Sequence, residues 1–283
     1  MNFAQSSFAR FLTFIRFSHT VFALPFALGA MVVAANGWPS ARLFGLILLA
    51  MAFARTAAMI FNRLADWEID KRNPRTAGRH KLVSRQVAIT GLVVSAALFI
   101  VTCWFINRPC FWFSPLALLV VCFYSLTKRF TSFAQFFLGL ALGVAPIGAW
   151  LAVRTQIDLP PFVLALGVLC WVAGFDMIYA CQDYEVDKKE GLKSMVVRLG
   201  IPRALLWAQG LHLMMLLILI AFGFSAGLGK IYFGSLSLVV IALIYEHRVA
   251  KKLDLAAINT AFFNSNAVVS LLFLGAIIAD RCF

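Results

Sequence analysis

Long runs of apolar residues, separated by short charged or turn-forming stretches, alternate along nearly the whole chain. Each run approaches the ~20 residues that a helix needs to cross a bilayer, and is too long for a membrane β-strand. Only helices and closed barrels satisfy their backbone hydrogen bonds inside lipid, so the pattern predicts an all-α polytopic membrane protein. We predict one domain, 1–283, with nine transmembrane helices at roughly 18–36, 43–61, 86–106, 111–125, 132–152, 161–180, 204–225, 231–246 and 256–279.

The composition agrees with this pattern and excludes a soluble enzyme. Of the 283 residues, 62% are hydrophobic and 13% are charged, whereas ordinary globular domains have about 45–50% and about 25%. The mean hydropathy is +0.89. Function must therefore depend on the few polar residues that such a chain retains.

The basic residues lie between the apolar runs. The formal net charge is +13, but the lysines and arginines do not form one soluble face, so we expect no nucleic-acid partner. With nine spans, most of the 25 Lys and Arg residues fall at the N-terminus and in the alternate loops on its side. Because cytoplasmic loops are enriched in these residues, we expect a protein of the cytoplasmic (inner) membrane. Its N-terminus and basic loops would be cytoplasmic, and its C-terminus would lie on the opposite side.

The acidic residues are scarce and gather in two stretches. The chain has 12 Asp and Glu residues, most of them within 66–70 and 176–190. In each stretch, polar residues follow one another in steps of four: Asn62, Asp66 and Asp70 in the first, and Tyr179, Asp183 and Asp187 in the second. Residues four apart share one face of a helix. The matching spacing predicts two internally related halves, each with an acidic stripe at the cytoplasmic end of a helix.

The two stripes indicate a metal–diphosphate site. Stacked carboxylates repel one another and do not stabilise a helix. Mg²⁺ relieves this repulsion, since it binds one or two carboxylates together with phosphate and water oxygens. Each stripe is followed by a basic loop, KRNPRTAGRHK or KKEGLK, that suits the remaining phosphate charge. An inert, ion-paired helix end would explain one such stretch, but it gives no reason for two that match.

Three motifs resemble those of the UbiA superfamily of intramembrane prenyltransferases. The family pattern NDxxDxxxD is similar to residues 62–70, DxxYxxxDxxxD to residues 176–187, and YxxxK to residues 124–128. Arg63 departs from the first pattern, since it stands where the family usually has Asp; it removes one acidic contact and adds a cation. The strings FNRLADWEIDKRNPRTAGR and YSLTKRFT are most similar to prenyltransferases of quinone biosynthesis, of the 4-hydroxybenzoate type or the futalosine route to menaquinone.

The resemblance implies transfer of a polyprenyl group from polyprenyl diphosphate to a ring carbon of an aromatic acceptor, with Mg²⁺ as cofactor and membrane lipid as surroundings. The metal ligands it implies are Asn62, Asp66, Asp70, Asp183 and Asp187. The diphosphate-binding residues it implies are Arg63, Arg72, Arg75, Arg79 and Lys128. The catalytic candidates are Tyr124, Lys128, Asp176 and Tyr179. Because water would capture an allylic cation, the site must be sunk between helices, and loop 62–85 is long enough to cap it.

Two charged residues lie deeper than the stripes. Asp176 and Arg55 each precede a stripe residue by seven positions, which places them about 10 Å further along their helices. Asp176 either orients the acceptor or takes the ring proton, or it is a hydrogen-bonding partner of Tyr179 or Tyr124. Arg55 either holds an acidic group of the acceptor or pairs with Asp176, because a charge at that depth is costly unless paired.

A membrane transporter with an intramembrane ion or substrate site is the alternative from another functional class. Acids that cluster at one mouth and share loops with bases favour diphosphate chemistry instead. We interpret His212 as an interfacial or loop residue and Glu246 as part of a solvated helix end. We expect Gly139, Gly143 and Gly148 to allow close helix packing.

Overall fold

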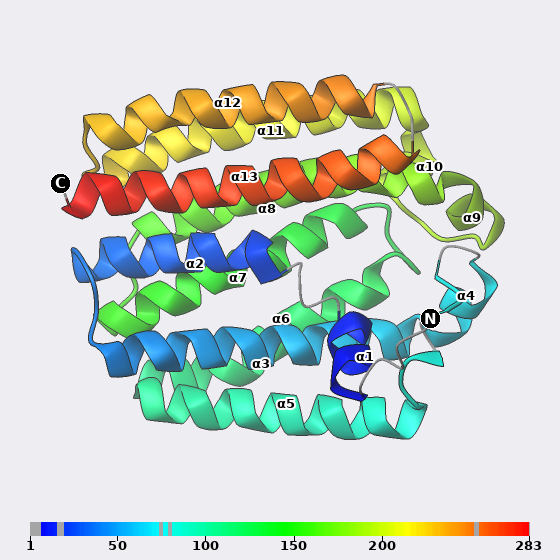
Figure 1. Ribbon diagram of the computed structural model, residues 1–283, viewed down its shortest axis with the longest axis horizontal. Helices are drawn as coiled ribbons and strands as arrows, with labels where there is room; N and C mark the ends of the chain where they lie inside the picture. Colours follow the sequence, from blue (N-terminus) through cyan, green and yellow to red (C-terminus); the bar gives the residue numbers. More distant parts are fainter. Residues whose placement is uncertain (1–6, 16–19, 74–75, 79–80, 252–254, 283) are drawn as a thin grey trace, which may run out of the picture.

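The computed structural model describes residues 7–15, 20–73, 76–78, 81–251 and 255–282, and every regular element among them is helical. This confirms the all-α prediction. The long helices run side by side along the molecule, and the short helices α4, α9 and α10 gather at one end, which we call the loop end; the opposite end is the far end (Figure 1). The elements are α1 (Ser7–Phe14), α2 (Thr20–Ala35), α3 (Ala41–Ala65), α4 (Trp67–Arg72), α5 (Arg85–Ile106), α6 (Arg108–Thr127), α7 (Ala134–Arg154), α8 (Pro160–Ala180), the 3-10 helix η3 (Cys181–Asp183), α9 (Tyr184–Lys189), α10 (Met195–Leu199), α11 (Ile201–Ser225), α12 (Lys230–Ala250) and α13 (Leu255–Cys282).

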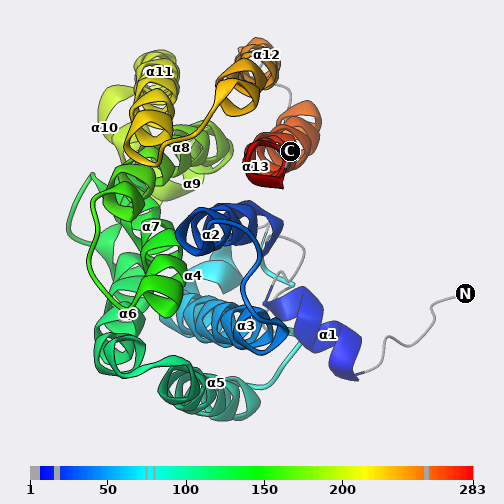
Figure 2. The same cartoon turned by 90° about the vertical axis from the view of Figure 1, so that its left-hand side faces the viewer.

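Eight helices in the described residues are long and apolar enough to cross a membrane. They correspond to all the predicted spans except the first. That span is α2, which has 16 residues and is therefore about 24 Å long, somewhat less than the ~30 Å of a hydrocarbon core. It nevertheless lies inside the bundle, against α7 and α13 (Figure 2). The count of nine is thus eight full spans and one shorter apolar helix.

Several helices begin where the sequence places a capping residue or a proline. Ser40, Ser84 and Asn107 precede α3, α5 and α6, and each side chain accepts a hydrogen bond from the backbone N–H three residues further on, at 3.3, 3.3 and 2.8 Å. These bonds satisfy N–H groups that have no partner within the helix. Prolines occupy the first turns of α6, α8 and α11, where a missing N–H costs nothing.

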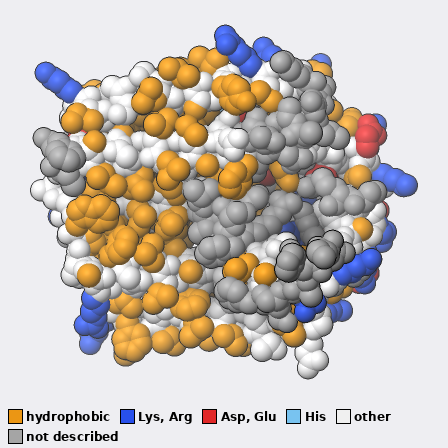
Figure 3. Space-filling model, viewed as in Figure 1, with side chains coloured by type: hydrophobic (Ala, Val, Ile, Leu, Met, Phe, Trp, Pro, Cys, Tyr) orange, Lys and Arg blue, Asp and Glu red, His pale blue; other side chains and the backbone are white. Residues whose placement is uncertain are grey.

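Helix α8 lies at the centre of the bundle. Its apolar stretch is 61% buried, against 22% for α5 and for α6. The core beside it is aromatic: the ring of Phe26 on α2 lies 4.8 Å from Trp171 on α8 and 4.5 Å from Phe273 on α13. On the outside, hydrophobic side chains cover much of the visible face, with Lys and Arg at its ends (Figure 3). This distribution is typical of a protein surrounded by lipid, and we conclude that the chain is an integral membrane protein.

Close packing of α7 on α8 depends on two of the three glycines singled out above. A Cβ at Gly139 would lie 2.5 Å from the carbonyl oxygen of Leu169, and one at Gly143 would lie 3.0 Å from that of Ala165. The expectation is confirmed for these two. It is wrong for Gly148, where a Cβ would meet nothing within 4 Å.

The interpretation of His212 and Glu246 as interfacial or solvated residues is wrong. Both are buried, with 2% and 1% of their surface exposed. His212 Nδ1 lies 2.9 Å from His247 Nε2, and Glu246 accepts a hydrogen bond of 2.9 Å from Asn266 Nδ2 on α13. The polar groups of α11, α12 and α13 therefore bond one another inside the bundle, where water is not available.

Candidate active site

Both acidic stripes lie where a long helix breaks. Asp66 separates α3 from α4, with φ −94° and ψ 13°. Asp183 ends η3 and precedes α9, with a closely similar φ of −99° and ψ of 5°. These angles belong to the sparsely populated region where turns and many active-site residues are found. Each stripe is therefore bent at its middle aspartate, which corrects the expectation of a straight helical face.

The two acidic segments meet at the loop end. Asn73 Nδ2 donates a 3.4 Å hydrogen bond to Asp183 Oδ1, and Arg72 forms a 2.7 Å ion pair with Glu190. These contacts join segments more than 100 residues apart in the sequence. The convergence on which the diphosphate hypothesis depends is thus present in the structure.

A cavity of about 700 Å³ begins between these segments and continues between α3, α6, α7 and α8. Its size is within the range of small-molecule sites, ~300–1,000 Å³. Eleven of the residues predicted from the sequence line it: Arg55, Asn62, Arg63, Asp66, Asp70, Tyr124, Lys128, Asp176, Tyr179, Asp183 and Asp187. Residues predicted to act together therefore line the same cavity, and we call the part of the lining that they form the polar wall.

Asp66 is held by basic residues from the loop after α6. Its carboxylate lies 2.6 Å from Lys128 Nζ and 3.5 Å from the Arg129 guanidinium. Arg129 also donates to the carbonyl oxygen of Ala65. Since Asp66 is only 5% exposed, these cations offset a charge that would be costly to bury alone. The YxxxK motif and the first acidic stripe are thus in direct contact.

Arg63 is buried beneath the first stripe. Its Nε donates a 3.3 Å hydrogen bond to the carbonyl oxygen of Phe14, and its NH1 lies 3.7 Å from Asp70. The residue that departs from the family pattern therefore ties α1 to the stripe, in addition to lining the cavity. This contact fixes the position of Asp70.

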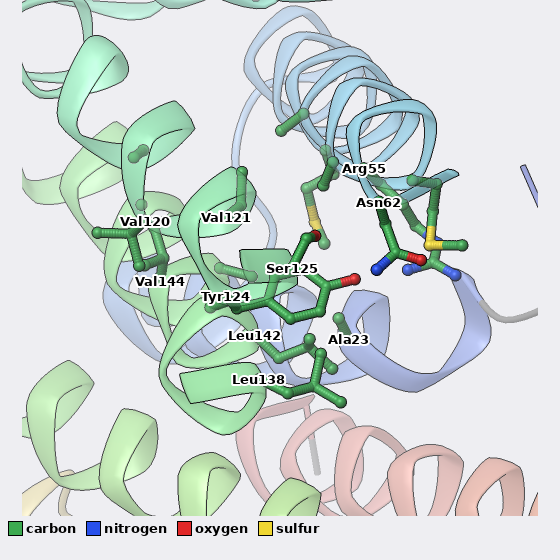
Figure 4. A pocket seen from close by; sticks show the side chains of 18 of the residues that line it. Ala23, Arg55, Asn62, Val120, Val121, Tyr124, Ser125, Leu138, Leu142 and Val144 are labelled. Carbon is green, nitrogen blue, oxygen red and sulfur yellow. The ribbon is translucent and has the colours of Figure 1, made fainter. Parts of the chain in front are cut away.

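The deeper part of the polar wall surrounds Tyr124. In Figure 4 its ring extends from α6 into the cavity, with the hydroxyl directed towards Asn62 on α3. Arg55 and Asp176 also line the cavity and lie within electrostatic reach of this hydroxyl. Polar groups from α3, α6 and α8 therefore line the same part of the cavity.

Two charged residues of α4, Arg72 and Glu68, do not line the cavity. Arg72 pairs with Glu190 and has 60% of its side chain exposed, so it links the two loops rather than lining the cavity. Glu68 accepts a 2.9 Å hydrogen bond from Lys71, which lowers the pKa of Glu68, and it does not line the cavity. Arg75 and Arg79 lie outside the described residues.

The cavity is also lined by polar residues that the sequence analysis did not single out, among them Asn73, Thr76, Ser125, Gln135 and Ser194. Asn73 follows Asp70 by three residues, so continuing the helical stripe would have found it. Gln135 accepts a hydrogen bond of 3.3 Å from the Met195 N–H, a pairing across the fold that no local pattern indicates.

The donor set suits a divalent cation that shares its ligands with a phosphate. Within the described ranges, no three His, Cys, Asp or Glu side chains are close enough to enclose an ion. Asp66 Oδ1, however, is buried and accepts no hydrogen bond among these residues. Asp70, Asp183 and Asp187 line the same cavity. Mg²⁺ is commonly bound by one or two carboxylates plus substrate phosphates, so these residues fit that ion.

Below the polar wall, the cavity is apolar over most of its length. Its lining there includes Ile47, Phe99, Leu138 and Leu142, and it extends to Trp150 near the end of α7. Figure 4 shows Leu138 and Leu142 beneath Tyr124. A charged mouth above a long apolar cavity fits a ligand with an anionic head and a hydrocarbon tail.

Comparison with known proteins identifies the family. The model of the UbiA prenyltransferase family matches residues 23–268. The chain belongs to the UbiA prenyltransferase family. It is therefore an enzyme that transfers prenyl groups, which disfavours the transporter.

Relatives and solved structures of the family cover most of the chain. The 4-hydroxybenzoate octaprenyltransferase of Francisella tularensis subsp. novicida (strain U112) is 29% identical over 257 residues, 89% of each protein. That of Yersinia pseudotuberculosis serotype IB is 29% identical over 255 residues, 89% of this chain and 88% of the relative. A UbiA homologue from Aeropyrum pernix K1 has a TM-score of 0.83 at 30% identity, over 93% of this chain and 98% of its own.

A second UbiA homologue, from Archaeoglobus fulgidus and bound to GPP and Mg²⁺, has a TM-score of 0.74. It covers 97% of this chain and 100% of its own, at 22% identity. This likeness supports the shared fold.

Proposed function

We propose that this UbiA enzyme transfers a polyprenyl group from polyprenyl diphosphate to a ring carbon of an aromatic quinone precursor, with Mg²⁺ as cofactor. The observation that carries the proposal is the meeting of two acidic segments and Lys128 at the mouth of one apolar cavity. The relatives named as 4-hydroxybenzoate octaprenyltransferases support an aromatic acid as acceptor. The second candidate for the acceptor is the menaquinone precursor of the futalosine route, which is supported only by the similarity of the sequence strings described above.

The polar mouth would bind the diphosphate. Bound Mg²⁺, held by Asn62, Asp66, Asp70, Asp183 and Asp187, would offset the charge that grows on the leaving group. Lys128 and Arg63 would donate charge-assisted hydrogen bonds to phosphate oxygens. To do so, Lys128 exchanges its carboxylate partner Asp66 for a phosphate oxygen.

In the reaction, the bond between the allylic carbon and the diphosphate oxygen breaks, and the diphosphate keeps the electron pair. A ring carbon supplies the electrons of the new carbon–carbon bond and then loses its proton, for which Asp176 is the proposed acceptor. Arg55 would orient an acidic group of the acceptor. The apolar lining keeps water from the reacting carbon.

The orientation and location belong to the proposal as well. We infer that the loop end, which carries the diphosphate-binding residues, faces the cytoplasm, because the basic loops gather there. The cytoplasmic membrane is the corresponding location. We further infer that residues 1–283 form a single catalytic domain built from two related halves, which the matching backbone at Asp66 and Asp183 supports.

Substitution of the central aspartates tests the proposal. Asp66→Asn and Asp183→Asn, purified and reconstituted, should each lower the rate of diphosphate release and product formation by about 10²–10³-fold, the typical cost of losing one group that stabilises transition-state charge. Product mass spectrometry should offer 4-hydroxybenzoate and a dihydroxynaphthoate side by side.

Glu68→Gln is the matched control. Glu68 is two residues from Asp66, but it is exposed and pairs with Lys71 outside the cavity, so its variant should retain full activity. Full activity in both aspartate variants, or turnover unaffected by EDTA, would refute the metal–diphosphate assignment.

A further inference from the structure

The apolar cavity reaches the far end of the bundle, where the Trp150 side chain forms part of its lining, which we call the floor. Its lining continues down α6 and α7 to Trp150, and then to Asp158 and Pro161 at the connection into α8. A second cavity of about 550 Å³ lies at this end, lined among others by Asn36, Arg154 and Ser225. Trp150 and Asp158 line both cavities. These two side chains therefore lie between the two cavities.

The Trp150 indole is fixed in this position. It is only 6% exposed, and its Nε1 donates a 2.8 Å hydrogen bond to Asp158 Oδ2. The other oxygen of Asp158 accepts from Gln156 at 3.3 Å, and the Arg154 guanidinium lies 3.6 Å from the carboxylate. A planar side chain held at its polar edge cannot rotate away without breaking this network. The Trp150 side chain is thus held in one position at the floor.

The helix ends next to Trp150 are also held in place by hydrogen bonds. Asn107, before α6, donates hydrogen bonds of 3.0 and 3.1 Å to the carbonyl oxygens of Leu151 and Ala152 on α7. The start of α6 and the end of α7 are therefore held together next to Trp150. The width of the cavity at this level is limited by these hydrogen bonds from the Asn107 side chain to the α7 backbone.

The distance from mouth to floor limits the length of tail that fits. Gln135, at the polar mouth, and Trp150 lie on the same helix and are separated by about 22 Å at ~1.5 Å per residue. An extended isoprene unit is roughly 5 Å long, since it is a short run of carbon–carbon bonds of ~1.5 Å each. The cavity therefore holds roughly four units in a straight chain.

We propose that Trp150, held by Asp158, determines how much of the prenyl tail this protein buries. Tails longer than the distance to the indole must fold back or leave the bundle sideways into lipid, so further units add no affinity. The inference rests on the proposed function, because it takes the occupant of the cavity to be a prenyl diphosphate.

The test compares prenyl diphosphates of increasing length on wild-type protein and on Trp150→Ala. Affinity is measured as the ligand concentration that gives half-maximal thermal stabilisation of the purified protein. For the wild type, affinity should rise from geranyl through farnesyl to geranylgeranyl diphosphate and then level off. In Trp150→Ala, octaprenyl diphosphate should gain at least about tenfold over geranylgeranyl diphosphate, because burying added methylene groups is strongly favourable.

Trp112→Ala is the matched control, since Trp112 is 74% exposed on α6 at the same end and does not line the cavity. It should keep the wild-type length profile. Trp150→Leu provides a second opening of the floor should Trp150→Ala fail to fold. Asp158→Ala, which releases the indole, should shift the profile in the same direction.

An unchanged length profile in folded Trp150→Ala and Trp150→Leu would overturn the inference, since it would show that the tail leaves the bundle before reaching the floor. Stabilisation requires binding but no turnover. A protein that shows the length profile but forms no prenylated product would therefore contradict the proposed reaction while leaving the floor in place.

Discussion

Lys128 connects the acidic and basic parts of the site. Its ammonium pairs with Asp66 at 2.6 Å, and its backbone carbonyl accepts a 2.7 Å hydrogen bond from the Lys193 N–H, just before α10. One residue thus contacts the first acidic stripe and the loop that follows the second. Its side chain is 29% exposed, so it is accessible to a ligand at the mouth.

Replacing Lys128 with alanine should weaken binding of the diphosphate substrate. A hydrogen bond to a charged group contributes about 1.5–3 kcal/mol, so the Michaelis constant for the prenyl diphosphate should rise by about 10- to 100-fold. The constant for the aromatic acceptor should change much less, because Lys128 is at the mouth. Steady-state kinetics with each substrate varied in turn measures both.

Lys71→Ala serves as the control for Lys128, because Lys71 also lies near the mouth but pairs with exposed Glu68. Its kinetics should match those of the wild type. If Lys128→Ala raised the two Michaelis constants equally, a general disturbance of the fold would explain the result better than loss of a phosphate contact.

At the scale of single residues, site residues that repeat at a regular spacing could be predicted from the sequence. Residues that reach the site only through contacts between distant segments could not. Asn62, Asp66 and Asp70 could be found because four-residue steps place them on one face. Trp150 could not, because one tryptophan among many apolar residues gives no signal until α7 and the Asp158 carboxylate are placed beside each other.

Among the helices, α7 and α8 matter most for the shape of the cavity, because both form its walls. Their approach at Gly139 leaves no room for a side chain: a Cβ would lie 2.5 Å from Leu169 O and 2.9 Å from its Cα. Backbone atoms cannot move aside as a flexible side chain would. The helices themselves must therefore separate if this position is enlarged.

Gly139→Ala should lower the free energy of unfolding by about 1–3 kcal/mol, the usual cost of overpacking a tightly packed site. Prenyl transfer should fall with it, because the cavity walls shift. Thermal unfolding of the purified protein in detergent, followed by its tryptophan fluorescence, measures the first effect.

Gly45→Ala, on α3, is the control for Gly139, since a Cβ there meets nothing within 4 Å. Alanine favours helix over glycine, so this variant should be as stable as the wild type or slightly more so. Equal stability of both variants would contradict the close contact between α7 and α8.

Helix positions could be predicted well from hydropathy, but helix interruptions could not. The breaks at Asp66 and Asp183 interrupt a four-residue pattern that would suit one continuous helix. Likewise, the burial of Glu246 follows from its hydrogen bond with Asn266 on another helix. A charged residue near the end of an apolar run does not indicate such a partner.

At the scale of the whole molecule, α4 and the end of α13 lie at opposite ends of the bundle (Figure 1). The fold class and family motifs could be predicted from hydropathy and spacing. The assembly of the walls could not, because it depends on contacts between distant helices such as α2, α7 and α13.

Labelling of single cysteines should show how the bundle is oriented. In a background without the native cysteines, Lys230→Cys at the far end should react with a membrane-impermeant maleimide in intact cells. Glu68→Cys at the loop end should react after permeabilisation. Both positions are exposed. The reverse result would place the diphosphate site outside the cytoplasm and contradict the orientation inferred from the basic loops.

The Trp150 floor also has an electrical consequence. A cavity with a polar, hydrated mouth that continued open to the far surface would provide a path for protons and small ions, and energised membranes tolerate few such leaks. With Trp150 in the proposed role, its indole and the apolar lining above it would interrupt that path. Catalysis on a membrane-embedded substrate and conservation of the transmembrane potential would then depend on the same side chain.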